Sequence, residues 1–158
     1  MHQDLTARSW IFTFHLIASA VPVDLPWCHV ILHVSLLYIL QCAHLHFALP
    51  LPSFSVNIGH GEDNIALHFN PRFNYQGDNN VIVFNSRHGG SWSEERRENH
   101  FPFEQGEEFK VTISFNNEEF RVKLPDGNML YFPNRFGDDK YMYIQVEGDA
   151  RVTGFKLK

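Results

Sequence analysis

A strand pattern decides the fold at residues 65–72, which read Ile65-Ala66-Leu67-His68-Phe69-Asn70-Pro71-Arg72. Successive side chains of a β-strand point to opposite faces of the sheet. The apolar residues at odd positions therefore share one face, which we expect to cover a core. The polar residues His68, Asn70 and Arg72 share the other face, which we expect to lie in solvent.

The following residues extend this polar surface. Val81–Phe84 predicts a second strand that ends at Asn85, and the Gly-Gly pair after His88 predicts a turn. A third run begins at Trp92. One sheet surface would then display an imidazole, two amides, two guanidinium groups, a carboxylate and an indole. The candidate site residues are His68, Asn70, Arg72, Asn85, Trp92, Glu95 and Arg97.

These side chains suit a sugar. Each hydroxyl of a pyranose both donates and accepts hydrogen bonds, and one face of the ring is apolar. Arg72 and Arg97 can only donate and the carboxylate of Glu95 can only accept, whereas the two asparagines do both. Trp92 adds a flat apolar surface with a polar edge. The pattern therefore favours carbohydrate binding.

The same residues closely resemble the galectin family. The matching pattern is His68-Phe69-Asn70-Pro71-Arg72-Phe73, then Asn85, then Trp92-x-x-Glu95-x-Arg97. The flanks are similar too, at Phe101-Pro102-Phe103, Phe120-Arg121-Val122-Lys123-Leu124-Pro125-Asp126-Gly127 and Phe132-Pro133-Asn134-Arg135. The resemblance runs from about Phe54 to Lys158. Matches in this number and order are specific, whereas Trp-x-x-Glu-x-Arg alone would be a weak signal.

The resemblance implies roles for the candidate residues. His68, Asn70 and Arg72 would bind the axial 4-hydroxyl of galactose. Asn85 and Glu95 would hold the 6-hydroxyl, and the indole at position 92 would stack on the apolar face of galactose. Glu95 would also reach the next sugar, glucose or N-acetylglucosamine, together with the guanidinium at position 97.

The chain from residue 54 onward reads as all-β. Short alternating runs separated by Gly, Asn, Asp and Pro predict an antiparallel β-sandwich, and the resemblance implies the jelly-roll type of galectins and legume lectins. Further strands are expected at Phe109–Phe115, Phe120–Leu124, Met129–Phe132, Tyr141–Val146 and Arg151–Leu157. No stretch has a strong helical period, and no tandem repeat is present. We therefore expect one carbohydrate-recognition domain at residues 54–158.

Residues 1–53 differ in composition from the rest. No Asp, Glu, Lys or Arg occurs between Asp24 and Glu62. The apolar run Trp10–Val23 has the outline of a signal peptide. A second run, Val30–Leu51, is long enough to span a bilayer, although histidines interrupt it. Three interpretations of this atypical apolar leader stay open: a signal or membrane segment, an alternative first exon or gene-model artefact, and a packed part of the domain.

Galectins usually begin with two strands before the one that here is Phe54–Ile58. One is an edge strand, and the other lies inside the sheet behind the sugar face. The usual sequence of neither is recognisable in residues 1–53. Cys28–Val34 has strand-forming residues and is a candidate for the inner strand; without it, the sandwich would lack its first two strands. Because galectin dimers commonly pair edge strands from both chain ends, we expect impaired homodimer formation.

Composition argues against other partners. The net charge of −5, without a basic run, argues against nucleic acid as a partner. Cys28 and Cys42 lie outside the galectin-like part, so no disulfide framework is predicted. The pairs His29-x3-His33 and His44-x-His46 have spacings that a metal could use, but they lie in the apolar leader. We expect no cofactor and no metal.

Catalysis is not expected either. The adjacent pairs Glu94-Glu95, Glu107-Glu108 and Glu118-Glu119 would alternate across a strand, so they would not converge as the carboxylates of a glycosidase do. His68 could act as a general base, but the sequence has no nucleophile motif such as Gly-x-Ser-x-Gly.

The sequence thus predicts a lectin that reversibly binds β-galactosides, of the lactose and N-acetyllactosamine type, on glycoproteins and glycolipids. The alternative is an interaction protein that keeps the galectin fold but has lost or weakened sugar binding through its altered amino end. The resemblance implies a cytoplasmic and extracellular location reached without a signal peptide. An apolar leader that acted as a signal or anchor would instead direct the chain to a membrane or to secretion.

Overall fold

The computed structural model describes residues 10–17, 30–33, 52–148 and 151–157. These residues form twelve strands and no helix. The strands are β1 (Trp10–Ile17), β2 (Val30–His33), β3 (Phe54–Gly61), β4 (Asn64–Tyr75), β5 (Asp78–His88), β6 (Ser91–Trp92), β7 (Arg96–Glu98), β8 (Glu108–Phe115), β9 (Glu119–Lys123), β10 (Met129–Pro133), β11 (Tyr143–Gly148) and β12 (Arg151–Leu157).

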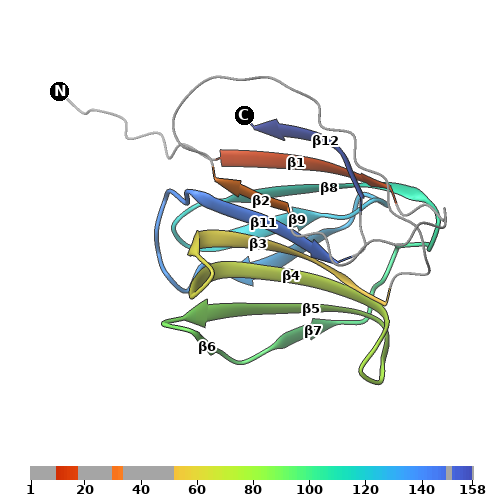
Figure 1. Ribbon diagram of the computed structural model, residues 1–158, viewed down its shortest axis with the longest axis horizontal. Coiled ribbons are helices and arrows are strands. Elements are labelled where there is room, and N and C mark those ends of the chain that lie inside the picture. The colour runs from red at the N-terminus through yellow and green to blue at the C-terminus, as the bar shows by residue number, and fades with distance from the viewer. Residues whose placement is uncertain (1–9, 18–29, 34–51, 149–150, 158) are drawn as a thin grey trace.

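The strands form two sheets (Figure 1). One has seven strands, in the order β2-β11-β3-β4-β5-β6, with β7 also paired to β5. The other has five strands, in the order β10-β9-β8-β1-β12. All described strand pairs are antiparallel. The prediction of an all-β antiparallel sandwich is confirmed.

An aromatic core joins the two sheets. The ring of Phe54 on β3 stacks on Phe109 of β8, with centroids 5.3 Å apart. The ring of Phe84 on β5 stacks on Phe132 of β10 at 5.6 Å. All four side chains are buried. Burial of large aromatic side chains is a major source of folding free energy, so these contacts hold the seven-stranded sheet in a fixed position.

The alternation read from the sequence agrees with the burial pattern on β8, but only in part on β4, where Asn70 of the face expected in solvent is buried. On β8, the predicted inward residues Phe109, Val111, Ile113 and Phe115 are buried. The predicted strands between residues 109 and 157 occur within two residues of their expected ends. The predictions were too short for Phe54–Ile58 and Val81–Phe84, because β3 runs to Gly61 and β5 runs from Asp78 to His88. The extra pairing comes from the long antiparallel ladder with β4.

The segment before residue 54 contributes two strands. β1 lies between β8 and β12, which is the inside position that we expected to be empty or taken by Cys28–Val34. β2 comes from Cys28–Val34 but pairs with β11 at the edge of the seven-stranded sheet. The hypothesis that the first two strands are missing, and the placement of Cys28–Val34 as inner strand, are therefore wrong. The signal-like run Trp10–Val23 contains β1.

Within the residues that the structure describes, no helix has the length and apolar character needed to cross a membrane. Most of the second apolar run, residues 34–51, lies outside the described residues. The division of the chain at residue 53, and the nature of the leader, stay predictions.

Candidate functional site

β4 carries the first three candidate residues on one face. Asn70 is only 6% exposed, whereas His68 and Arg72 are partly exposed. Strand pairing places Asn85 of β5 directly beside His68. The apolar residues that alternate with the candidate residues on β4 are buried, so the core beneath the sheet sets the position of this polar row.

Asn70 is held on both sides. Its Nδ2 donates to the backbone carbonyl of Phe54 at 2.6 Å, and its Oδ1 accepts from Arg72 Nε at 2.8 Å. Because the amide can orient in only one way between these two partners, one amide hydrogen and one lone pair remain for a ligand. The contact with Arg72 also fixes the plane of the guanidinium group.

Two arginines share carboxylates at the site. Asp78 Oδ2 is 2.6 Å from Arg72 Nη1, and Asp78 Oδ1 is 2.6 Å from Arg97 Nη1. Glu95 Oε2 accepts from Arg97 Nη2 at 2.8 Å, and Glu95 Oε1 is 3.8 Å from Arg72 Nη2. Hydrogen bonds from Arg97 and then Arg72 hold the pKa of Asp78 below its ordinary value, and those carboxylates raise the pKa of Arg97.

Asn85 is almost fully buried, at 5% exposure. Its Nδ2 donates to the carbonyl of Ser93 at 2.9 Å, and its Oδ1 accepts from the backbone N–H of Ser86 at 2.8 Å. Arg135 donates through Nη2 to the carbonyl of Glu94 at 3.0 Å. Two successive carbonyls of the segment between β6 and β7 are thus tied down. This segment connects the candidates Trp92 and Glu95.

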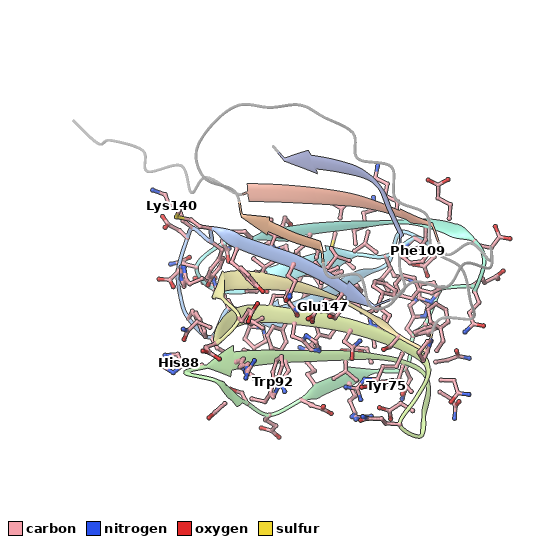
Figure 2. All side chains as sticks on the ribbon, in the orientation of Figure 1. Tyr75, His88, Trp92, Phe109, Lys140 and Glu147 are labelled. Carbon is pink, nitrogen blue, oxygen red and sulfur yellow. The ribbon has the colours of Figure 1, made fainter. Side chains whose placement is uncertain are left out.

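Trp92 is placed by a tight hairpin. Gly89 and Gly90 have φ values of 55° and 81°, in the left-handed region that glycine adopts without strain. The turn brings Trp92 opposite Arg87, whose guanidinium lies 5.6 Å from the ring centroid. The indole is 49% exposed and lies beside β5, toward the end where β6 begins (Figure 2). An indole so placed offers an open face to an apolar surface.

His68 lies next to Trp92, with ring centroids 4.8 Å apart. Burial, and then the positive charge of Arg72, lower the pKa of His68 to about 4. The imidazole is therefore neutral near neutral pH. Its Nδ1 lies 2.6 Å from the side-chain oxygen of Asn57 on β3.

The structure brings all the candidate residues together. His68 contacts Trp92 and pairs with Asn85, while Asn70, Arg72, Glu95 and Arg97 form a continuous chain of contacts. The result is a row of fixed donors and acceptors along one wall, beside a half-exposed indole.

The chain is similar to known galactoside-binding lectins. The sequence profile described as galactoside-binding lectin matches residues 41–157. A β-galactoside-binding lectin of Electrophorus electricus is 47% identical over 106 residues, which cover 67% of this chain and 78% of the relative. The chain belongs to the galectin family.

Solved structures give the same result. Congerin II bound to lactose and MES has a TM-score of 0.73 and 30% identity, covering 94% of this chain and 90% of congerin II. The homodimeric agglutinin CG-16 from chicken liver has a TM-score of 0.72 and 33% identity, covering 99% of this chain and 95% of that one. The profile match begins at residue 41, so it extends into the segment predicted as a leader.

Three residues that position the site of this galectin were missed in the sequence. Asp78, Asn57 and Arg135 contact Arg72, His68 and the loop after Trp92, respectively. Asp78 could have been suspected, because it is an acidic residue that directly follows the short turn after β4, close in sequence to Arg72. Asn57 lies on the neighbouring strand β3 and Arg135 lies in a loop far away in sequence, and no local pattern links either residue to the site.

Two hollows border the sheet of this galectin. One of about 360 Å³ adjoins Trp92 and is lined by Asn57, Arg87 and Gln145 among others. A larger one of about 630 Å³ lies between Phe73 and Phe103 and contains none of the candidate residues. The smaller hollow lies next to the polar wall, so a ligand stacked on Trp92 would lie beside this hollow.

Proposed function

We propose that the wall formed by the candidate residues binds the galactose unit of a β-galactoside. The galectin family is a family of galactoside-binding lectins, and this chain belongs to it. The observation that carries the site assignment is the placement of Trp92, half exposed beside a row of polar groups whose orientations are already fixed.

Each group in the row has a capacity that suits a sugar. The indole of Trp92 would cover the apolar face of galactose. His68, Asn70 and Arg72 would surround the axial 4-hydroxyl. Asn85 and Glu95 would hold the 6-hydroxyl. Arg97 would reach the second sugar together with Glu95.

Epimer selectivity follows from the fixed orientations. An equatorial 4-hydroxyl, as in glucose, would leave the polar groups of β4 without a partner while still shielding them from water. Each unmade polar contact costs about 1–3 kcal/mol. Two such losses, about 2–6 kcal/mol together, would separate galactosides from glucosides by about thirtyfold or more.

The proposed activity is binding without catalysis. Both acidic groups of the wall, Asp78 and Glu95, form ion pairs with arginine, and the pKa of Asp78 is lowered. A glycosidase needs a carboxylic acid whose pKa is raised, so that it can donate a proton to the leaving group. These features support a lectin.

Multivalency would give the protein its avidity. The hollows are open, so one site buries little of a small ligand and affinity per site is expected to be low. The relative CG-16 is a homodimeric agglutinin. β12 is the outermost strand of the five-stranded sheet, and an edge strand can pair with that of a second copy. We propose a homodimer through this edge, to be tested by sedimentation; the expectation of impaired dimerisation would be met if the chain sediments as a monomer.

Titration calorimetry with lactose tests the site. Trp92→Ala and Arg72→Ala should each abolish measurable binding while thermal unfolding stays cooperative. Arg121→Ala is the control, because Arg121 pairs with Glu119 in a similar contact on the other sheet. It should bind lactose like the unmodified chain. Near-normal affinity in both site variants would disprove the assignment.

A lactose-agarose column separates this function from that of a galectin-fold interaction protein without sugar binding. The full chain should be retained and eluted by free lactose, as should a chain with a typical galectin amino end. Passage of the full chain through the column, with retention of the second chain, would favour the interaction protein.

A further inference from the structure

Asn57 lies at the centre of a buried polar group next to the proposed sugar site. It is 1% exposed and pairs directly with His68 across the β3–β4 ladder. Its Oδ1 is 2.6 Å from His68 Nδ1. Its Nδ2 lies 3.0 Å from both Gln145 Oε1 and Glu147 Oε2, which come from β11 on the other side of β3.

These partners determine which way the amide of Asn57 faces. The carboxylate of Glu147 is an acceptor, so the group facing it must be the –NH₂ of Asn57. A flipped amide would place its carbonyl oxygen against the oxygens of Glu147 and Gln145, and would lose both hydrogen bonds. The carbonyl oxygen of Asn57 therefore faces β4 and His68.

The orientation of Asn57 in turn determines which ring nitrogen of His68 carries the hydrogen. A carbonyl oxygen only accepts, so His68 Nδ1 must donate to it. The ring is neutral because burial and the charge of Arg72 lower the pKa of His68. A neutral imidazole has one N–H. The hydrogen is on Nδ1, and Nε2 is left as an acceptor.

An acceptor at this point completes the chemistry of the β4 row. Arg72 has only donors, and Asn70 already uses Oδ1 to accept from Arg72 and Nδ2 to donate to Phe54. A hydroxyl group brings one hydrogen and two lone pairs. Donors for the lone pairs are plentiful, whereas the acceptors left in this row are one lone pair of Asn70 Oδ1 and the ring nitrogen of His68. His68 Nε2 is suited to accept it.

We propose that Asn57 is a positioning residue that holds His68 in the Nδ1–H form, so that Nε2 accepts the hydrogen of a galactose hydroxyl. The proposal rests on the assignment of His68 to the sugar site. Its first claim, that Asn57 holds the His68 hydrogen on Nδ1, concerns the ligand-free protein and can be tested without any sugar. Specificity follows from the second claim, that Nε2 accepts a hydroxyl hydrogen. A ligand whose group at this position can accept a hydrogen bond but not donate one should be rejected.

The first experiment is nitrogen NMR of the ligand-free full chain near neutral pH, with the His68 ring assigned through its two-bond couplings. The expected spectrum has a protonated Nδ1 and an unprotonated Nε2. A protonated Nε2 in the unmodified chain would overturn the proposal. Because this measurement needs no substitution, it decides the question even if variants of Asn57 fail to fold.

The second experiment compares two substitutions of Asn57. Asn57→Leu removes the acceptor, so the His68 hydrogen should move partly to Nε2 and lactose affinity should fall about tenfold. Asn57→Asp keeps an oxygen facing Nδ1 and should retain the Nδ1–H form. Unchanged protonation of His68 in a folded Asn57→Leu variant would overturn the positioning role.

The third experiment uses 4-deoxy-4-fluoro-lactose, whose fluorine accepts hydrogen bonds weakly and does not donate. The unmodified chain should discriminate against it relative to lactose, and Asn57→Leu should discriminate less. Equal discrimination by both proteins would contradict the role of Nε2 as the acceptor. Failure of the site assignment itself gives a different result, namely normal lactose binding by Trp92→Ala with the predicted His68 spectrum unchanged.

Discussion

The two ends of the candidate site are built differently. The inner end, formed by His68, Asn70, Arg72 and Asn85, is largely buried, and three of its side chains bond to uncharged partners or to the backbone. The outer end, formed by Trp92, Glu95 and Arg97, is exposed, with 45% of the Arg97 side chain and 39% of the Glu95 side chain in solvent. The inner end is therefore fixed before a ligand arrives, whereas the outer end can adjust to it.

This difference separates two contributions to binding. A buried polar group left without a partner costs much more than an exposed one, because water can replace a lost partner only at the exposed site. Exposed ion pairs are worth about 0–1 kcal/mol. The inner end should therefore decide which sugar binds, and the outer end should adjust how tightly it binds.

The largest effect is expected at Arg72. Arg72→Ala removes the donors that face the sugar and also frees Asn70 Oδ1 and Asp78 Oδ2 from their partner. Lactose affinity should fall by more than about a hundredfold, since several charge-assisted hydrogen bonds are lost together. Titration calorimetry at high protein concentration measures this loss of affinity. A loss of less than tenfold would place the determinants of binding elsewhere than the inner end.

Acidification should act on the inner end through His68. The pKa of His68 is about 4 in the folded chain, against an ordinary value of 6.5. Between these values the unfolded chain binds a proton that the folded chain does not, so stability falls as the pH falls across this window and levels off below it. The His68 contribution is at most roughly 3 kcal/mol.

Urea unfolding at a series of pH values isolates this contribution. His68→Gln cannot titrate at this position, so its stability should fall less than that of the unmodified chain between the two pKa values. Carboxylates elsewhere affect both proteins alike. Parallel curves for the two proteins would mean that His68 is not held neutral.

A moderate effect is expected at the outer end. Arg97→Ala removes the nearer partner of Glu95 and one partner of Asp78, while Arg72 still pairs with Asp78 and lies 3.8 Å from Glu95. Lactose affinity should fall about tenfold, and stability should change little, because the pairs are exposed. If Arg97→Ala were as damaging as Arg72→Ala, the distinction between the two ends would fail.

The smallest effect is expected one residue away. Arg96 alternates with Arg97 on β7, so its side chain points to the other face of the strand, where it pairs with Glu98. Arg96→Ala should change lactose affinity by less than about twofold. It matches Arg97→Ala in residue type, strand and exposure, so a large effect would show that charge alone matters rather than placement.

Local sequence predicted one face of the site well. The alternation along residues 65–72 placed His68 and Arg72 opposite the buried Leu67 and Phe69, as the structure has it. The period of two is a property of every strand, so it needs no information from elsewhere in the chain.

The positioning residues could not be read in the same way. Asn57 and Arg135 reach the site because β3 pairs with β4 and because the loop after β10 folds over β5. Pairing and folding of this kind depend on contacts between residues that are distant in sequence. Trp10–Ile17 shows the same limit, since an apolar run suits both a signal peptide and an inner strand, and its pairing with β8 and β12 cannot be read from the run itself.

Successive residues of β4 contribute alternately to the core and to the proposed site. Its odd positions supply Leu67 and Phe69 to the aromatic interior, and its even positions supply the groups proposed to touch the ligand. Adding or deleting one residue in this stretch would turn phenylalanine rings toward water and arginine toward the interior. The strand can therefore vary in composition but not in length. New specificities in this protein would have to arise through substitutions on β4, or through length changes in the loops around it.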